Sequence, residues 1–194
     1  LEIAVNANPQ AGGNDDHGVV VQTYADLKAT LDEVLLDLAP ISLRAGADSA
    51  AAAFALMALW QEKGIAPDQA QASFNIDPLG TLAQTGSLPY GMQSAYAQMR
   101  HIASHSLTVW PKARAVGVNA AIYHAAGASE AQELGAALAT AIAYLRELEQ
   151  SDADLGALAA SFTFTFALDA DVFLGIAKLR AARRLWARVL EASG

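Results

Sequence analysis

Residues 118–134 read Val118-Asn119-Ala120-Ala121-Ile122-Tyr123-His124-Ala125-Ala126-Gly127-Ala128-Ser129-Glu130-Ala131-Gln132-Glu133-Leu134. The first half is apolar and predicts the end of a buried strand over residues 115–123, since short apolar runs before a turn are typical of parallel sheets. Gly127 then predicts a tight turn. Ser129 and Gln132 form a capping-box pattern for a helix that we expect to reach about residue 149. The stretch therefore predicts a strand, a turn and a helix in succession.

The same succession recurs along the chain. Further candidate strands cover residues 1–5, 19–22, 40–45, 72–76 and 161–167, and helical patterns separate most of them. Strands that alternate with helices of ten or more residues predict a parallel sheet in an α/β fold. A complete (β/α)8 barrel needs roughly 250 residues, so five or six strands cannot close one. We expect a single α/β domain over residues 1–194, and the periodicity leaves two alternatives: a small doubly wound sheet or a partial TIM-type (β/α)8 barrel.

Composition restricts the kinds of partner. The chain has 194 residues, a formal net charge of −8 and no cysteine. Nucleic-acid binding needs a concentrated basic face, so the acidic balance argues against it. No apolar run reaches the roughly 18 residues of a membrane span. We therefore expect a cytoplasmic protein with no nucleic-acid and no membrane partner.

Basic residues concentrate in the last predicted helix, over residues 171–191. Five of the 12 basic residues are Lys178, Arg180, Arg183, Arg184 and Arg188. Charged side chains on a helix usually form a solvated or partner-facing surface. We expect that role for these five.

Residues 161–166 alternate strictly, as Ser161-Phe162-Thr163-Phe164-Thr165-Phe166. Successive side chains of a strand point to opposite faces. We predict that the three aromatic rings pack against helices and that Thr163 and Thr165 line the other face. An ordinary half-exposed strand has the same pattern and stays an alternative.

Three segments carry a family resemblance. They are residues 35–48, with Leu-Asp-Leu-Ala-Pro followed by Gly-Ala-Asp; residues 75–80, Asn-Ile-Asp-Pro-Leu-Gly; and residues 118–148, continued by residues 173–187. Together they resemble the barrel domain of methylmalonyl-CoA mutases, which interconvert methylmalonyl-CoA and succinyl-CoA. The resemblance implies part of a (β/α)8 barrel that holds an acyl-CoA.

The resemblance also implies adenosylcobalamin in the complete enzyme, on a separate domain, where the cofactor supplies the radical chemistry. The family's Asp-x-His-x-x-Gly motif for binding cobalamin is not matched by Asp15-Asp16-His17-Gly18. We therefore expect no cobalamin-binding domain within residues 1–194 and no cofactor bound by this chain alone.

The residues around His124 bear on the type of subunit. Catalytic chains of the family read Gly-Tyr-His-x-Gln-Glu-Ala-Gly-Ala, with the active-site histidine five residues before the second glycine. That position is Ile122 here. Ile122-Tyr123-His124 followed by Ala126-Gly127 is instead similar to the small, non-catalytic subunit. The resemblance thus implies a heterodimer with a homologous, catalytic large subunit.

His124 is nevertheless the one candidate for a catalytic residue, and no other residue is assigned that role. As a strand residue it would share a face with Ile122, since side chains two apart point the same way. Asn75 stands where catalytic chains carry a glutamine near the substrate. Asp77 follows it, although Asp-Pro is also typical of a turn.

Five residues are therefore candidates for substrate binding: Asn75, Asp77, His124, Thr163 and Thr165. Small polar side chains would suit a barrel threaded by a pantetheine chain, and no metal site is expected. The leading hypothesis is a small-subunit segment that supports the catalytic large subunit. Two others are a catalytic barrel of a divergent acyl-CoA mutase, with His124 and Asn75 in its site, and a stand-alone acyl-CoA or small-ligand binding module.

Overall fold

The computed structural model describes residues 1–4 and 21–193, and all structural statements below concern these residues. Five parallel strands form one sheet. They are β1 (Glu2–Ala4), β2 (Ile41–Arg44), β3 (Ala72–Ile76), β4 (Ala113–Asn119) and β5 (Phe162–Thr165). The predicted strand at 19–22 and the segment 15–18 lie partly or wholly outside the described residues.

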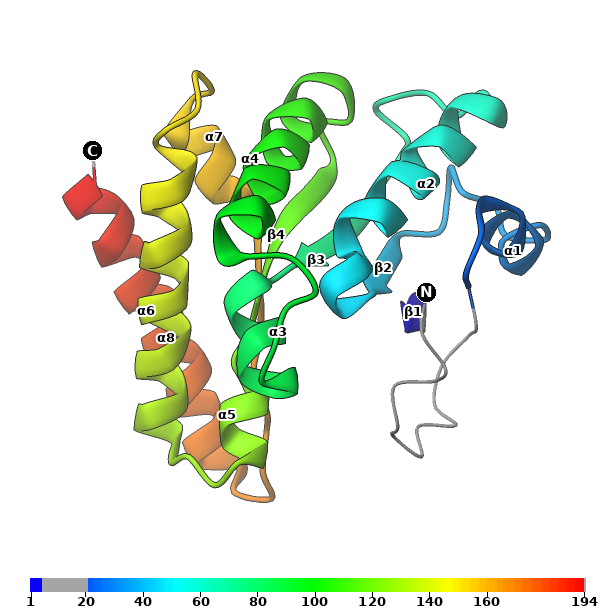
Figure 1. Ribbon diagram of the computed structural model, residues 1–194. Coiled ribbons are helices and arrows are strands. Elements are labelled where there is room, and N and C mark those ends of the chain that lie inside the picture. The colour runs from blue at the N-terminus through cyan, green and yellow to red at the C-terminus, as the bar shows by residue number, and fades with distance from the viewer. Residues whose placement is uncertain (5–20, 194) are drawn as a thin grey trace.

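At least one helix comes after each described strand in chain order (Figure 1). They are α1 (Tyr24–Thr30), the 3-10 turn η1 (Gly46–Asp48), α2 (Ser49–Glu62), α3 (Pro78–Thr85), α4 (Met92–Val109), α5 (Ala121–Ala125), α6 (Glu130–Leu148), α7 (Leu155–Ala160) and α8 (Val172–Ser193). None of the helices in this described part is long and apolar enough to cross a bilayer.

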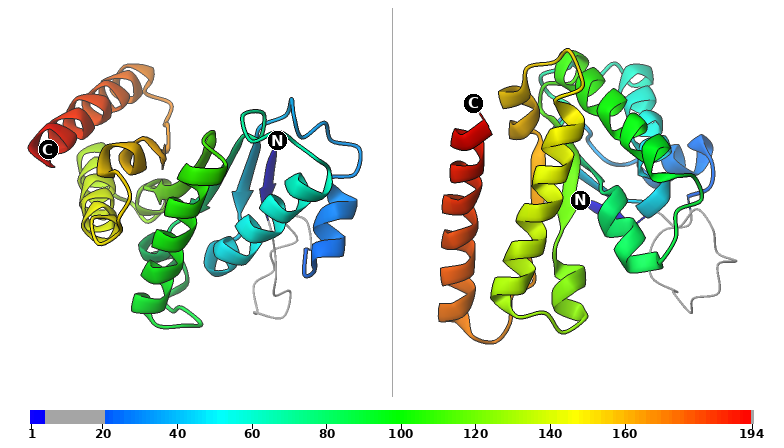
Figure 2. Two further views of the ribbon diagram at one scale, coloured as in Figure 1. Left: turned by 90° about the horizontal axis from the view of Figure 1, so that it is seen from above. Right: turned by 60° about the vertical axis from the view of Figure 1, so that its left-hand side comes forward.

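Strand order decides between the two predicted architectures. The sheet order is β1-β2-β3-β4-β5, the order of the chain itself. Parallel crossovers are almost always right-handed, so steps in a single direction place all helices on one face of the sheet. Figure 2 shows the helices in an arc along one side. A doubly wound sheet reverses direction and has helices on both faces. The chain therefore forms part of a (β/α)8-type barrel wall, as the family resemblance implied.

The core lies between the sheet and this arc of helices. Leu43 and Phe74 of the sheet and Trp60 of α2 are fully buried. The Trp60 ring centroid lies 6.0 Å from that of Phe74 and 5.1 Å from that of Trp110. Each such side chain contributes about 1.5–3 kcal/mol on burial. This apolar layer fixes which face of each strand meets the helices.

The aromatic residues of β5 pack as the alternation predicted. Phe162 and Phe164 have ring centroids 5.2 Å and 5.1 Å from Trp186 of α8. Thr163 and Thr165 point to the opposite, helix-free face of the sheet, because neighbouring strand residues alternate.

That helix-free face is polar near the start of the strands. Glu2, Ser42, Ser73 and Arg114 are aligned across the four strands β1 to β4. Together with Lys112 they line a groove of about 390 Å³. Bulky branched side chains dominate the interior of a typical barrel, so these polar positions differ from that pattern.

One predicted boundary is wrong. The strand expected over residues 115–123 ends at Asn119, and residues 121–125 form the short helix α5. Alanine favours a helix, and a short apolar run does not by itself distinguish strand from helix. The last sheet contact comes from the Ala120 amide, which donates to the Thr165 carbonyl oxygen at 2.9 Å. By contrast, the capping box of Ser129 and Gln132 is confirmed.

Strands β3 and β4 approach unusually closely at one point. Their register shifts between Ser73 and Ile76, and Asn75 has a φ of 50°. Asparagine is among the few non-glycine residues that tolerate this left-handed conformation. A Cβ atom on Gly117 would lie 2.7 Å from the Asn75 Cα and 2.9 Å from its carbonyl carbon. The irregularity in β3 therefore requires glycine opposite it in β4.

Gly117→Ala should destabilise the fold by about 1–3 kcal/mol, because the new methyl group meets backbone atoms that cannot turn away. The matched control is Gly135→Ala in the exposed part of α6, where a Cβ would meet nothing within 4 Å. That change should stabilise the helix by up to about 1 kcal/mol. Urea unfolding of both variants measures the two effects. Equal effects of the same sign would contradict the close approach of β3 and β4.

Candidate functional site

Polar residues gather where the parallel strands end, at the lower edge of the molecule in Figure 1. Asp77 follows β3, Asn119 ends β4 and Thr165 ends β5. In α/β folds of this kind, ligands bind at the carboxyl ends of the strands. This edge is therefore the candidate site.

Asp77 joins several elements at this edge through hydrogen bonds. Its Oδ1 accepts hydrogen bonds from the Gly80 amide at 2.9 Å and from the Tyr144 hydroxyl, and its Oδ2 accepts one from the Asn119 amide at 2.8 Å. The Tyr144 hydroxyl accepts a bond from the Leu79 amide at 2.8 Å. A single carboxylate thus joins the ends of β3 and β4 to α3 and α6.

The turn that Asp-Pro suggested is in fact the start of a helix. Asp77 is the N-cap of α3 and Pro78 occupies its first turn, where a missing amide proton costs nothing. Asp77 is only 8% exposed. Both of its oxygens are bonded within the protein, so the arrangement explains Asp77 as a structural residue.

Burial raises the pKa of the Asp77 carboxyl above its usual value of 3.8, and hydrogen bonds from Tyr144, Asn119 and Gly80 oppose that rise. Burial and the adjacent Asp77 carboxylate also raise the pKa of Tyr144. The tyrosine therefore keeps its proton and acts as the donor.

Asn75 lies on the helix-free face and contacts the neighbouring strand. Its amide nitrogen donates to the Ser42 Oγ at 3.0 Å and to the Leu43 carbonyl oxygen at 2.9 Å. The amide nitrogen is thereby held toward β2, on the face where a barrel would place its ligand.

Thr163 and Thr165 lie beside Gly117 and Asn119 in the register of β4 and β5. Thr163 Oγ1 and Asn119 Oδ1 are shielded from solvent and have no hydrogen-bond partner in the described part of the chain. Buried polar atoms are nearly always paired in folded proteins. Each of these two atoms therefore keeps unused hydrogen-bonding capacity within the described part of the chain.

His124 belongs to a different cluster. It lies on α5, so the prediction that it shares a strand face with Ile122 is wrong. Its Nδ1 is 3.8 Å from the Oε2 of Glu133, a carboxylate with no exposed surface. The Glu133 Oε1 accepts a hydrogen bond from the Ala167 amide at 2.8 Å. His124 is thus turned toward α6 and the loop that follows β5.

Lys178 occupies the centre of this cluster. Its Nζ donates to Glu133 Oε2 at 2.5 Å and to the Ala167 carbonyl oxygen at 2.5 Å, and it also contacts Glu130. Its side chain is only 1% exposed. The expectation of a solvated side chain is therefore wrong for Lys178, whereas the four arginines of the same helix are exposed.

The ammonium group serves as the cation of the cluster. Ligand atoms of His124, Glu130 and Glu133 lie within 4.8 Å of one another, a spacing that a metal ion could bridge. Lys178 already contacts both carboxylates there. Burial disfavours its charge, but hydrogen bonds to Glu130 and Glu133 outweigh this and raise the pKa of Lys178. The cluster thus acts as an internal ion pair that fixes α8 against α6.

The predicted site residues therefore separate into groups. Asp77 and Thr165 both contact residues at the end of β4, through the Asn119 and Ala120 amides. Asn75 instead contacts β2, and His124 faces Glu133. The structure does not join Asn75 and His124 through any described contact.

Three important residues were missed by sequence reasoning, namely Asn119, Glu133 and Tyr144, and Lys178 was assigned to the wrong environment. Lys178 follows the small Gly175 by three positions, so both lie on one side of α8. In the structure both are buried. Tyr144 carried no comparable signal, because its partner Asp77 is 67 residues away in the chain.

Comparisons with known proteins agree on one family. Residues 6–194 match the family model described as Methylmalonyl-CoA mutase. The chain is 46% identical over 168 residues to a methylmalonyl-CoA mutase small subunit from Streptomyces virginiae, a match that covers 87% of this chain and 27% of that protein. It is 37% identical to a probable small subunit from Mycobacterium tuberculosis, over 87% of this chain and 26% of the relative.

A large subunit from the same Streptomyces species is less similar. The methylmalonyl-CoA mutase large subunit of Streptomyces virginiae is 25% identical over 205 residues, which cover 98% of this chain and 27% of the relative. The chain thus spans little more than a quarter of the length of these relatives.

The pH dependence of stability tests the buried Asp77. Because its pKa in the folded state is raised, the folded state binds this proton more tightly than the unfolded state does. The contribution of Asp77 to the unfolding free energy should therefore fall as the pH rises from 3.8 through the folded pKa. The quantity to measure is the unfolding free energy of the unaltered chain minus that of Asp77→Asn, which should decrease over this range. Tyr144→Phe removes a hydrogen bond that lowers the pKa of Asp77. In the Tyr144→Phe background, the stability difference between Asp77 and Asp77→Asn should therefore keep decreasing up to a higher pH. A difference that grows with pH would refute the raised pKa.

Lys178→Met tests the ion pair. The substitution leaves the carboxylates of Glu130 and Glu133 without their buried cation. It should cost about 3–5 kcal/mol of unfolding free energy. Arg184→Met, on the exposed side of the same helix, should change stability by no more than about 0.5 kcal/mol. Urea unfolding near pH 7 compares the two. A Lys178→Met protein as stable as the Arg184→Met control would show that the ion pair does not hold α8.

Proposed function

The chain belongs to the methylmalonyl-CoA mutase family, and from that premise we propose that it is part of the barrel of a small subunit. The observation that carries this proposal is the contrast between two relatives from one organism. The chain is 46% identical to the small subunit of Streptomyces virginiae and 25% identical to the large subunit. A difference of this size favours descent from the small-subunit lineage.

The proposed role is to pair with and support a homologous large subunit that interconverts methylmalonyl-CoA and succinyl-CoA. Two features of this chain argue against catalysis by its own residues. Ile122 stands where the resemblance expects the active-site histidine. His124 is directed toward Glu133, a partner engaged by Lys178 and by the Ala167 amide.

The helix-free face is the surface that we assign to an acyl-CoA ligand. Asn75, Thr163 and Thr165 present small polar groups there, and Thr163 Oγ1 lacks a described partner. Small polar side chains leave room along a barrel axis that bulky residues would fill. We propose these three as the residues nearest to any bound pantetheine chain, and assign Asp77 to the framework.

Adenosylcobalamin would supply the radical chemistry of the complete enzyme. The family's Asp-x-His-x-x-Gly motif for binding cobalamin does not occur in residues 1–194. We therefore propose that the cofactor is not bound by this chain alone.

The alternative of a stand-alone binding module is less well supported. Within the described residues, β1 and β5 each pair with one neighbour only. Open edges of a parallel sheet are an aggregation hazard, so such a sheet is expected to continue into further strands. A single barrel domain over residues 1–194 and a cytoplasmic location stay predictions.

The proposal is tested by turnover of the full-length subunit. We expect no conversion of methylmalonyl-CoA to succinyl-CoA by this subunit with adenosylcobalamin, and conversion once its cognate large subunit is added. Product formation is followed by chromatography of the acyl-CoA esters.

His124→Ala is the decisive variant. In the complex it should leave kcat and KM unchanged, within about twofold, because His124 touches no reacting group in this proposal. Turnover by the isolated subunit that disappears in His124→Ala would instead establish the divergent catalytic barrel.

A further inference from the structure

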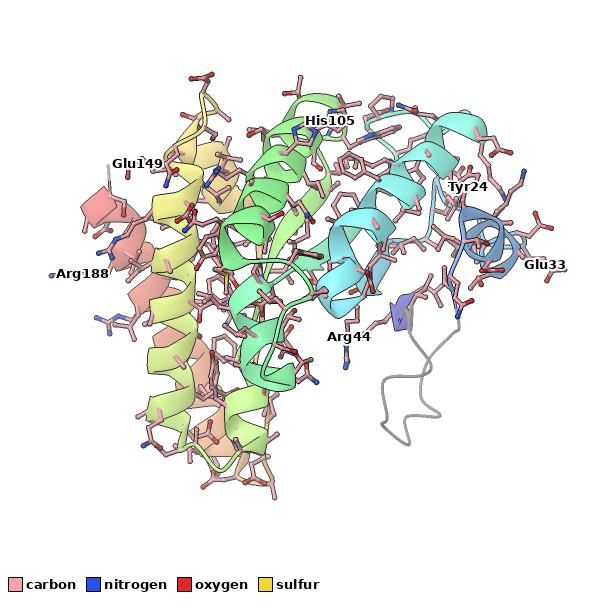
Figure 3. All side chains as sticks on the ribbon, in the orientation of Figure 1. Tyr24, Glu33, Arg44, His105, Glu149 and Arg188 are labelled. Atoms are coloured by element: carbon pink, nitrogen blue, oxygen red, sulfur yellow. The ribbon has the colours of Figure 1, made fainter. Side chains whose placement is uncertain are left out.

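The outer side of α8 carries an unusual row of residues. Phe173, Arg180, Arg184 and Arg188 are separated by seven, four and four positions, a spacing that places them on one side of a helix. All four are exposed. Figure 3 shows the labelled Arg188 projecting away from the body of the molecule. We call these four residues the arginine face.

The three arginines of the arginine face form no ion pair within the described residues. Within the described residues, none of the three guanidinium groups lies within 4.0 Å of a carboxylate, although other surface cations, such as Lys28 and Arg100, form ion pairs. Arginines four positions apart repel each other and weaken a helix. The chain as a whole has a net charge of −8. Glu191 is the acidic residue on this side of α8, three positions after Arg188, and three arginines outnumber it. The isolated fold does not explain why three like charges line up.

Phe173 adds an apolar anchor at one end of the row. It is 86% exposed, more than any other large hydrophobic side chain in the described part of the chain. Exposed aromatic and arginine residues are the types that dominate the binding energy of protein interfaces.

The support beneath the arginine face is rigid. Lys178 lies on the inner side of the same helix and is bonded to Glu133 and to the loop at Ala167. Gly175 is buried close to Leu168, since a Cβ added to it would lie 3.4 Å from the Leu168 side chain. A surface held in one conformation before binding loses little entropy when a partner docks.

We propose that the arginine face docks onto an acidic surface of the large subunit that also offers an apolar pocket for Phe173. This inference rests on the proposed pairing of the two subunits and names the side of this chain that makes it. Complementary charge fixes the orientation of such a contact and speeds its formation. The acidic balance of the chain disfavours nucleic acid as the occupant.

The test uses the full-length subunit and its cognate large subunit. Arg184→Glu with Arg188→Glu changes the net charge by four units and should raise the Kd of the heterodimer about tenfold or more. Phe173→Ser should also weaken binding, and the Kd of the unaltered pair should rise with salt. Sedimentation velocity or calorimetry measures each Kd.

Lys28→Glu with Lys63→Glu is the matched control, because it makes the same change in net charge on α1 and just beyond α2, on the opposite side of the molecule (Figure 1). It should leave the Kd within about twofold, as expected for charges remote from an interface. If both double variants raise the Kd equally, the effect comes from net charge alone, and the arginine face is not the docking surface.

The remaining outcomes are equally informative. If the unaltered subunits do not associate, the proposed function and this inference fall together. If they associate and the arginine-face variants bind with an unchanged Kd, the docking surface is wrong but the proposed function stands. Loss of thermal stability in the isolated full-length variant would show that the arginine face is covered by the chain's own further residues, and that also overturns the proposal.

Discussion

The carboxylate of Asp77 is the interaction on which the arrangement of this fold depends. It accepts bonds from α3, from the end of β4 and from Tyr144 of α6, and all of them meet at one buried point. A charge in such a place is costly unless hydrogen bonds compensate for the lost water. Because the partners come from three elements, the strand ends are fixed relative to one another. The positions of the polar residues at this edge of the sheet follow from that arrangement of the strand ends.

Much of the fold was predictable because its signals are local. The capping box at Ser129 and Gln132 needs only four residues, and the alternation of Phe162 and Phe164 needs a single strand. Strand order is different in kind. No local pattern distinguishes a sheet built in one direction from a doubly wound one, and the family resemblance supplied that part.

The candidate site was less predictable because its bonds join distant residues. His124 was assigned to a strand, since an apolar run with alanines fits either structure, and α5 then turned it toward Glu133. Lys178 looked like one of five surface cations until its contacts with α6 placed it inside. Contacts 45 or more residues apart, such as those of Lys178 with Glu133, follow from packing and not from spacing.

The order of the strands has a consequence for how the protein is made. Each strand from β2 to β5 pairs with the strand synthesised just before it. A nascent chain can therefore add one unit at a time to a sheet that already exists, without waiting for distant segments. At every stage the newest strand has an unpaired edge, which can pair with the next strand of the chain or with a strand of another molecule. Synthesis rate and chaperone access should thus influence its yield more than they would for a fold whose central strands come last.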